Sequence, residues 1–132
     1  MIANPIRVTA DGRIHKHQQK LFSNGDIYDC EFVNGKPDGY GTFQTKDFKY
    51  TGSFSNGLYE GEGEIKYSNG NKFKGKFLKG KRYGYGEMVD MAKAIIYQGH
   101  FYDDKFNGFG ILLKDGHKME GHWNNGKYHQ SI

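Results

Sequence analysis

One phrase recurs about every 23 residues along this chain. It reads Tyr-x-Gly-x-Phe-x-x-Gly, then three spacer residues, then Gly-x-Gly. The copies begin at Tyr28, Tyr50, Phe73, Tyr97 and Met119, in steps of 22, 23, 24 and 22 residues. A fixed period in this range predicts a repeat array, in which each unit packs mainly against its neighbours. Such an array is typical of a surface for partners rather than a pocket for chemistry.

Each copy is predicted to form a β-hairpin. Successive side chains of a strand point to opposite faces, so Tyr50, Gly52 and Phe54 share one face. Asn56-Gly57 marks the first turn of this copy and Asn69-Gly70 the second. Asn-Gly is favoured in tight hairpin turns because both central positions need positive φ. Two strands per copy, with a turn after each, predict a continuous antiparallel meander.

The glycine between two aromatic residues is predicted to leave a gap that a ring of the neighbouring copy fills. Each ring pair would then contribute about 0.5–1.5 kcal/mol beyond its buried area. The chain is 36% hydrophobic and 16% aromatic, which is little aliphatic material for a globular core. Its 132 residues fit one domain, and five two-stranded copies predict a rod about 50 Å long.

These phrases resemble the MORN repeat, the membrane occupation and recognition nexus motif. The resemblance is clearest at residues 50–57 and 61–63 and extends over residues 21–128. It implies an all-β fold: an open, single-layer antiparallel meander of about five MORN-type hairpins, elongated rather than globular. It also implies scaffolding or tethering and, for some members, contact with acidic phospholipids.

The predicted organisation has four parts. Residues 1–17 form an arm that docks on a partner or a disordered tail, and residues 18–27 form a partial leading repeat. The array covers residues 28–128, and residues 129–132 form a C-terminal tail. Residues 89–96 of the third copy are unusually apolar and predict either a longer hairpin loop or a docking place. The last copy carries Met119 and Trp123 at ring positions, which predicts a cap or a homodimer through the C-terminal edge.

Charge is uneven along this chain of net charge +4. Residues 71–82 hold six basic residues and no acidic one: Lys72, Lys74, Lys76, Lys79, Lys81 and Arg82. The first three alternate with the aromatic positions, so they share the opposite face of one strand. Three interpretations stay open: an ordinary solvated face with edge-protecting lysines, a site for an acidic protein segment, or a patch for anionic lipid. Nucleic acid is disfavoured, because the periodic rings are needed between repeats.

The sequence carries no enzyme signature. Cys30 stands where other copies have glycine, so we expect it to be packed and inert. The six histidines are interpreted as surface residues, and no set of zinc ligands is complete. The paired glycines belong to the repeat, since no Gly-Lys-Ser/Thr follows them as in a phosphate-binding loop. We therefore expect no catalytic residue, cofactor or metal.

The expected function is a non-catalytic scaffold or adaptor of a larger intracellular assembly. The single cysteine fits a reducing compartment, and the N-terminus lacks the pattern of a secretory signal. The resemblance favours a cytoskeletal, ciliary or flagellar location within the cytoplasm. Candidate protein-binding rings are Tyr40, Tyr59, Tyr83, Tyr85, Phe106, Phe109 and Trp123; alternatively, several of them complete the stacked rings. The alternative function is a peripheral membrane tether that uses the basic residues of 72–82.

Overall fold

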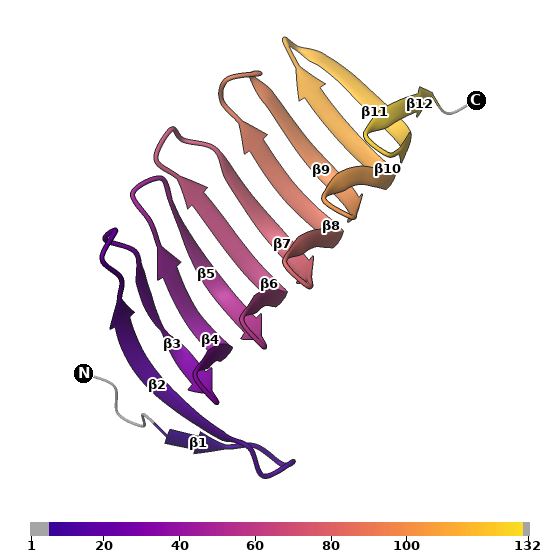
Figure 1. Cartoon of the computed structure of the whole chain (residues 1–132). Helices are drawn as coiled ribbons and strands as arrows, with labels where there is room; N and C mark the ends of the chain where they lie inside the picture. Colours follow the sequence, from indigo (N-terminus) through magenta and orange to yellow (C-terminus); the bar gives the residue numbers. More distant parts are fainter. Residues whose placement is uncertain (1–5, 131–132) are drawn as a thin grey trace.

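The computed structural model describes residues 6–130 and contains one open sheet of twelve antiparallel strands. Each strand pairs with the next in the sequence, so the sheet order is the chain order. The strands are β1 (Ile6–Val8), β2 (Ile14–Leu21), β3 (Ile27–Val33), β4 (Lys36–Gln44), β5 (Phe48–Ser55), β6 (Leu58–Tyr67), β7 (Lys72–Leu78), β8 (Lys81–Asp90), β9 (Ile95–Tyr102), β10 (Lys105–Lys114), β11 (His117–Asn124) and β12 (Lys127–Gln130). Figure 1 shows them as a single row from β1 to β12. The predicted all-β, single-layer meander is confirmed.

The sheet begins before the first full copy. β1 pairs with β2 through Ile6 and Lys16, and β2 pairs with β3 from Lys16 to Leu21. The described part of residues 1–17 therefore lies largely in strands that continue the sheet. The rest of the predicted arm, residues 1–5, and the end of the predicted tail, residues 131–132, lie outside the described residues.

The first turn of most copies has the expected tight geometry. In the second copy, Asn56 and Gly57 have φ of 51° and 87°. The fourth copy reaches the same geometry without glycine, because Asp103 and Asp104 adopt φ of 52° and 71°. Aspartate is among the few residues other than glycine that tolerate this region.

The second turns are of two kinds: Asp115 and Gly116 have φ of 51° and 75°, as predicted for a tight turn, but the Asn69-Gly70 turn differs. At residues 68–71 only Gly70 has positive φ, whereas Asn69 does not. The Tyr67 carbonyl accepts a hydrogen bond from Gly70 N at 3.1 Å, and Tyr67 N donates to the Asn71 carbonyl. This is the longer hairpin connection, a type I turn closed by a left-handed glycine. Residues 91–94 of the third copy form a longer hairpin loop still, between β8 and β9.

The rings that fill the glycine gaps belong to the same copy, which corrects the expectation of a neighbouring ring. A Cβ built on Gly63 would lie 2.5 Å from the Tyr50 hydroxyl oxygen and 2.6 Å from a ring carbon of Tyr50. Gly86 and Gly110 meet Phe73 and Tyr97 in the same way. The Tyr50 hydroxyl then donates a 2.6 Å hydrogen bond to the Ser53 carbonyl. The ring of each copy thus lies across its own paired glycines.

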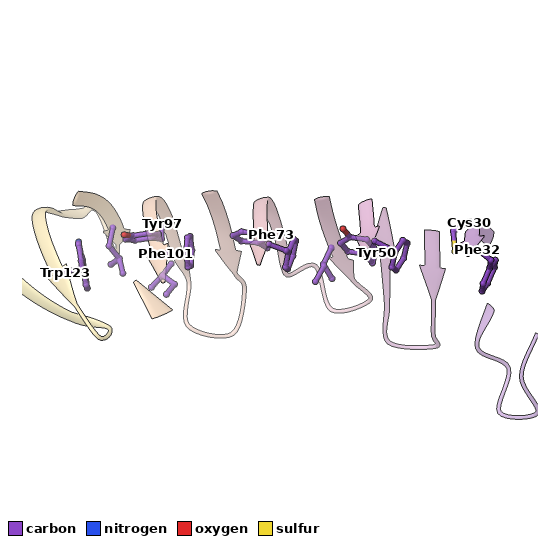
Figure 2. Close-up of a cluster of buried hydrophobic side chains, with 12 residues drawn as sticks. Cys30, Phe32, Tyr50, Phe73, Tyr97, Phe101 and Trp123 are labelled. Carbon is purple, nitrogen blue, oxygen red and sulfur yellow. The ribbon is translucent and has the colours of Figure 1, made fainter. Parts of the chain in front are cut away.

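Neighbouring copies join through ring edges, and we call this row of rings the ring ladder. The first ring of one copy meets the second ring of the next, with centroids 5.1–6.1 Å apart. The pairs are Tyr28–Phe54, Tyr50–Phe77, Phe73–Phe101 and Tyr97–Trp123. Figure 2 shows the labelled side chains, from Trp123 to Cys30 and Phe32, spread in one row along the sheet. Their face is called the aromatic face below, and the opposite one the outer face.

The ring ladder differs in the first and third copies, where Cys30 and Arg82 replace a repeat residue. In the first copy Cys30 occupies the glycine position and is fully buried, and Tyr28 stacks instead on Phe43 at 4.2 Å. In the third copy a guanidinium takes the place of a stacked ring. Arg82 lies 5.7 Å from the Phe73 centroid and 5.0 Å from that of Phe101.

Candidate functional site

A groove of about 600 Å³ lies on the aromatic face and extends from the second copy to the fifth. Its floor includes Phe73, Phe77, Met88 and Phe106. First-turn residues border it on one side and second-turn residues on the other. Gly80, Arg82, Asp104, Lys105 and Gly126 belong to the first-turn side, and Tyr67, Asn71, Asp90 and Lys93 to the second-turn side.

The groove has this shape because each hairpin bends. A register shift interrupts the pairing of β5 with β6, of β7 with β8 and of β9 with β10. Such bulges bend a strand and increase its twist. The first-turn ends accordingly curl away from the plane of the strands in Figure 1. The bent ends form one wall beside the apolar floor.

Charges lie on both walls of the groove. Arg82 is held by Asp104, whose Oδ1 is 2.9 Å from Arg82 Nε and whose carbonyl accepts from Nη2 at 2.6 Å. Asp90 Oδ1 accepts a hydrogen bond from the backbone N of Lys93. The side chains of Lys93 and Lys105 are exposed. An apolar floor with exposed lysines on opposite walls suits a partner segment that carries apolar and acidic side chains.

The seven candidate rings fall on opposite faces of the sheet. Tyr59 stacks on Tyr50 at 3.8 Å and Phe106 on Tyr97 at 3.9 Å, and Trp123 is 6% exposed with its Nε1 donating to the Gly110 carbonyl. These three belong to the ring ladder. Tyr40, Tyr83, Tyr85 and Phe109 are exposed. A homodimer through the C-terminal edge stays a prediction.

The basic run of residues 72–82 does not fold into one basic surface. Lys74 lies directly opposite Glu64 on one side and Glu87 on the other, and Lys76 lies opposite Glu62. Lys81 Nζ is 2.8 Å from Asp103 Oδ1, and Arg82 is paired with Asp104. Lys79 donates its backbone N to Glu60. The sheet register therefore places carboxylates beside most of these side chains.

The register instead creates a lysine row that the sequence run did not reveal. Lys49 pairs directly with Lys66, and Lys66 with Lys72, across β5, β6 and β7. All three side chains are exposed, and Lys66 Nζ lies 3.5 Å from Glu64 Oε1. These lysines lie far apart in the sequence, so only strand pairing could bring them together. Met88 and Lys105 of the groove were missed for the same reason, whereas Lys93 lies within residues 89–96, which the sequence offered as a longer loop or a docking place.

The side chains that could take part in a reaction, Cys30, His15 and His17, are buried or hydrogen-bonded to the protein. Burial raises the pKa of the Cys30 thiol to about 12, so little thiolate exists near neutral pH. His15 corrects the interpretation of the histidines as surface residues, because it is 3% exposed and its Nδ1 lies 2.9 Å from the Asp38 carbonyl. His17 Nε2 lies 2.6 Å from Asp29 Oδ1. No cluster of three potential metal ligands occurs within residues 6–130.

Comparisons with known proteins agree with this geometry. The family model of the MORN repeat matches residues 28–47, 50–72, 97–118 and 120–129. The chain belongs to the MORN repeat family. The stretch between the second and third matches holds β7 and β8, which form the same hairpin with Arg82 in place of a stacked ring.

The MORN array is also similar to alsin. It is 27% identical over 124 residues to alsin of Rattus norvegicus and to alsin of Homo sapiens. The alignment includes 85% of this chain but only 8% of each alsin, so this chain corresponds to a small part of those relatives. MORN repeats commonly bind proteins or membrane lipids. Among residues 6–130 there is no helix long and apolar enough to cross a membrane.

Proposed function

We propose that this MORN array is a non-catalytic scaffold or adaptor that binds a segment of a partner protein in the groove of its aromatic face. The observation that carries the proposal is the groove itself, about 600 Å³ in volume, with an apolar floor between two polar walls. A continuous groove across several copies fits an extended segment or an amphipathic helix. Such a module would hold parts of a larger assembly together, and we propose a cytoskeletal, ciliary or flagellar one in the cytoplasm.

Recognition would combine burial with charge. The partner's apolar side chains would cover Phe77, Met88 and Phe106, which line the groove. Its carboxylates would approach Lys93 and Lys105 on the two walls. The ring ladder gives a rigid floor, because each ring is already held by its own copy and by the next one. A rigid, preformed floor lowers the ordering cost of binding.

A peripheral membrane tether is the second candidate function. The lysine row of Lys49, Lys66 and Lys72 favours it, because three exposed ammonium groups lie on adjacent strands of the outer face. Each lysine near an anionic membrane contributes about 1 kcal/mol. This candidate predicts binding that weakens steeply with salt.

The experiment compares two variants with equal charge change in native cells. Lys93→Glu with Lys105→Glu alters the groove walls, and Lys49→Glu with Lys66→Glu alters the outer lysine row. Cells are extracted with detergent, washed with salt, and the protein is quantified in pellet and supernatant. We expect the wild type and the outer-row variant to stay in the pellet and the groove variant to be released.

The opposite pattern would support the peripheral membrane tether instead of the scaffold. Release of the wild type by detergent alone, together with loss of liposome binding in the outer-row variant, would contradict the scaffold and support the tether. If neither variant differs from the wild type in the pellet, the groove is not the docking site.

A further inference from the structure

The outer face changes character along the array. The residue between the paired glycines points outward in each copy, and it is Tyr40, Glu62, Tyr85 and Phe109 in turn. In the N-terminal half its directly opposed neighbours are polar, as with Ser53 beside Tyr40. In the C-terminal half the neighbours are imidazoles. Tyr85 pairs with His100, and Phe109 pairs with His122.

These residues form what we call the outer ring row: Tyr85, His100, Phe109, His122 and His129, one from each strand of β8–β12. Tyr85 is 53% exposed and Phe109 is 46% exposed. The Tyr85 and His100 rings lie 6.0 Å apart at 78°, and the Phe109 and His122 rings 6.2 Å apart at 80°. Perpendicular neighbours leave notches between ring faces rather than one flat platform. The ring ladder lies on the opposite face, so it makes no use of these rings.

The spacing of the row matches the pitch of a polyproline II helix. Tyr85 and Phe109 lie two strands apart, which is about 9.6 Å. A polyproline II helix advances about 9.3 Å in one turn of three residues. A segment running along the array would therefore place every third residue at an equivalent notch, and about six residues would cover the row. Such a helix has no internal hydrogen bonds, so its carbonyls can accept from the Tyr85 hydroxyl and from imidazole N–H groups.

The charges around the row favour an acidic segment. Lys76 of β7 borders Tyr85 across the β7–β8 bulge, and Lys127 of β12 lies on the face of His129 at the other end. Both lysines are exposed, and Lys76 also lies opposite Glu62. The lysines flank the row on its first-turn side, whereas Glu87 and Glu120 lie two residues from Tyr85 and His122 on its second-turn side. Carboxylates next to the prolines would therefore find cations along the first-turn side of the row.

We propose that the outer ring row binds an acidic, proline-rich segment of a partner protein in the polyproline II conformation. This surface lies on the face opposite the groove, so one MORN array could hold two partners at once. The segment crosses the strands rather than adding to an edge. Its prolines fill the notches between rings, and its carboxylates pair with Lys76 or Lys127.

The test is a titration of the purified protein with a fluorescent peptide of two aspartates followed by prolines. We expect saturable binding that Tyr85→Ala and Phe109→Ala each weaken about tenfold. Tyr40→Ala is the matched control, because Tyr40 occupies the same repeat position and is 60% exposed but has Ser53 as its neighbour. Its affinity should equal that of the wild type. All three rings are exposed, and circular dichroism verifies that each variant is folded.

Charge and conformation are tested separately. Lys76→Glu with Lys127→Glu should weaken the binding of the acidic peptide and strengthen the binding of a peptide with two lysines before the prolines. A glycine–serine peptide with the same aspartates should bind at least tenfold more weakly. The proposal would be overturned if the wild type did not bind the acidic proline peptide, or bound it no more tightly than the acidic glycine–serine peptide. It would also be overturned if Tyr85→Ala and Phe109→Ala left the affinity unchanged. Tighter binding of a cello-oligosaccharide or a single-stranded RNA would overturn it as well. The single groove variant Lys93→Glu should bind the peptide normally, which separates this site from the proposed scaffold function.

Discussion

At the scale of single residues, the glycines of this array are of two kinds. Gly57 has a φ of 87° and no atom within 4 Å of a built Cβ, so its role is to allow the turn. Gly63 lies under the Tyr50 ring, and all three of the nearest atoms belong to that ring. Its role is to provide space. The sequence shows both as Gly in a periodic phrase and does not separate these roles.

Gly63→Ala is expected to destabilise the array by about 1–3 kcal/mol, because the new methyl overlaps the Tyr50 ring. The free energy of unfolding is measured by urea denaturation. In a Tyr50→Val background the same glycine change should cost much less, since the obstructing ring is gone. Equal cost in both backgrounds would mean that the ring does not set the requirement for glycine.

At the scale of elements, the first turns are tied to one another by a repeated hydrogen bond. Gly57, Gly80 and Gly126 each donate their N–H at 2.8 Å to a carbonyl of the preceding copy, that of Pro37, Tyr59 and Phe106 respectively. A side chain adds a second bond in three places: Asp38 accepts from Asn56 N, Glu60 from Lys79 N and Asn107 from Asn125 N. The turns therefore stack as regularly as the rings.

Asp38→Ala is expected to cost about 1–3 kcal/mol, because Asp38 is 7% exposed and its carboxylate accepts from two donors, of which the Arg13 guanidinium is half exposed and can turn to water. These donors are Asn56 N at 3.0 Å and Arg13 Nη2 at 2.7 Å. Asp38→Asn should cost less, since its amide oxygen still accepts from Asn56 N. Hydrogen exchange of the Asn56 amide reports the loss directly. Asp47→Ala, at an exposed turn, is the control and should leave this amide as protected as in the wild type.

At the scale of the whole molecule, the array buries many groups that must stay protonated. Burial raises the pKa of Cys30 and of Tyr97 to about 12 each, and it also raises the pKa of Tyr50 and Tyr59. In the unfolded chain the thiol and the phenols titrate near 9.0 and 10.0. At pH values between the unfolded and the folded pKa of each group, the unfolded chain has lost a proton that the folded protein retains.

Above neutral pH, stability is therefore expected to be constant up to about pH 9 and to fall as the pH rises towards 12. Each buried group contributes a slope of at most about 1.4 kcal/mol per pH unit. Urea denaturation at a series of alkaline pH values measures the slope. Tyr59→Phe keeps the stacked ring and should make the slope shallower, whereas Tyr102→Phe changes an exposed ring and should not. Stability that does not change up to pH 11 would contradict this account.

The sequence alone determined the hairpin unit, its repetition and the face shared by the first, third and fifth positions of each copy. Period, turn residues and alternation are local properties, so Tyr50, Gly52 and Phe54 could be assigned to one face from the sequence. The basic run of residues 72–82 was equally visible, but its surroundings were not. Whether Lys74 faces lysines or carboxylates depends on which residues of β6 and β8 lie opposite it.

Only the tertiary structure decided the surfaces. Strand pairing placed Glu64 and Glu87 beside Lys74, joined Lys49 to Lys66 and Lys72, and separated Tyr59 and Phe106 from Tyr85 and Phe109. The bulges then bent the hairpins and formed the groove. The physical reason is that a strand's side-chain direction is set by its own alternation, whereas its neighbours are set by register. Each bulge shifts the register by two residues, so it changes which side chains lie opposite one another. The period in the sequence does not show where these shifts fall.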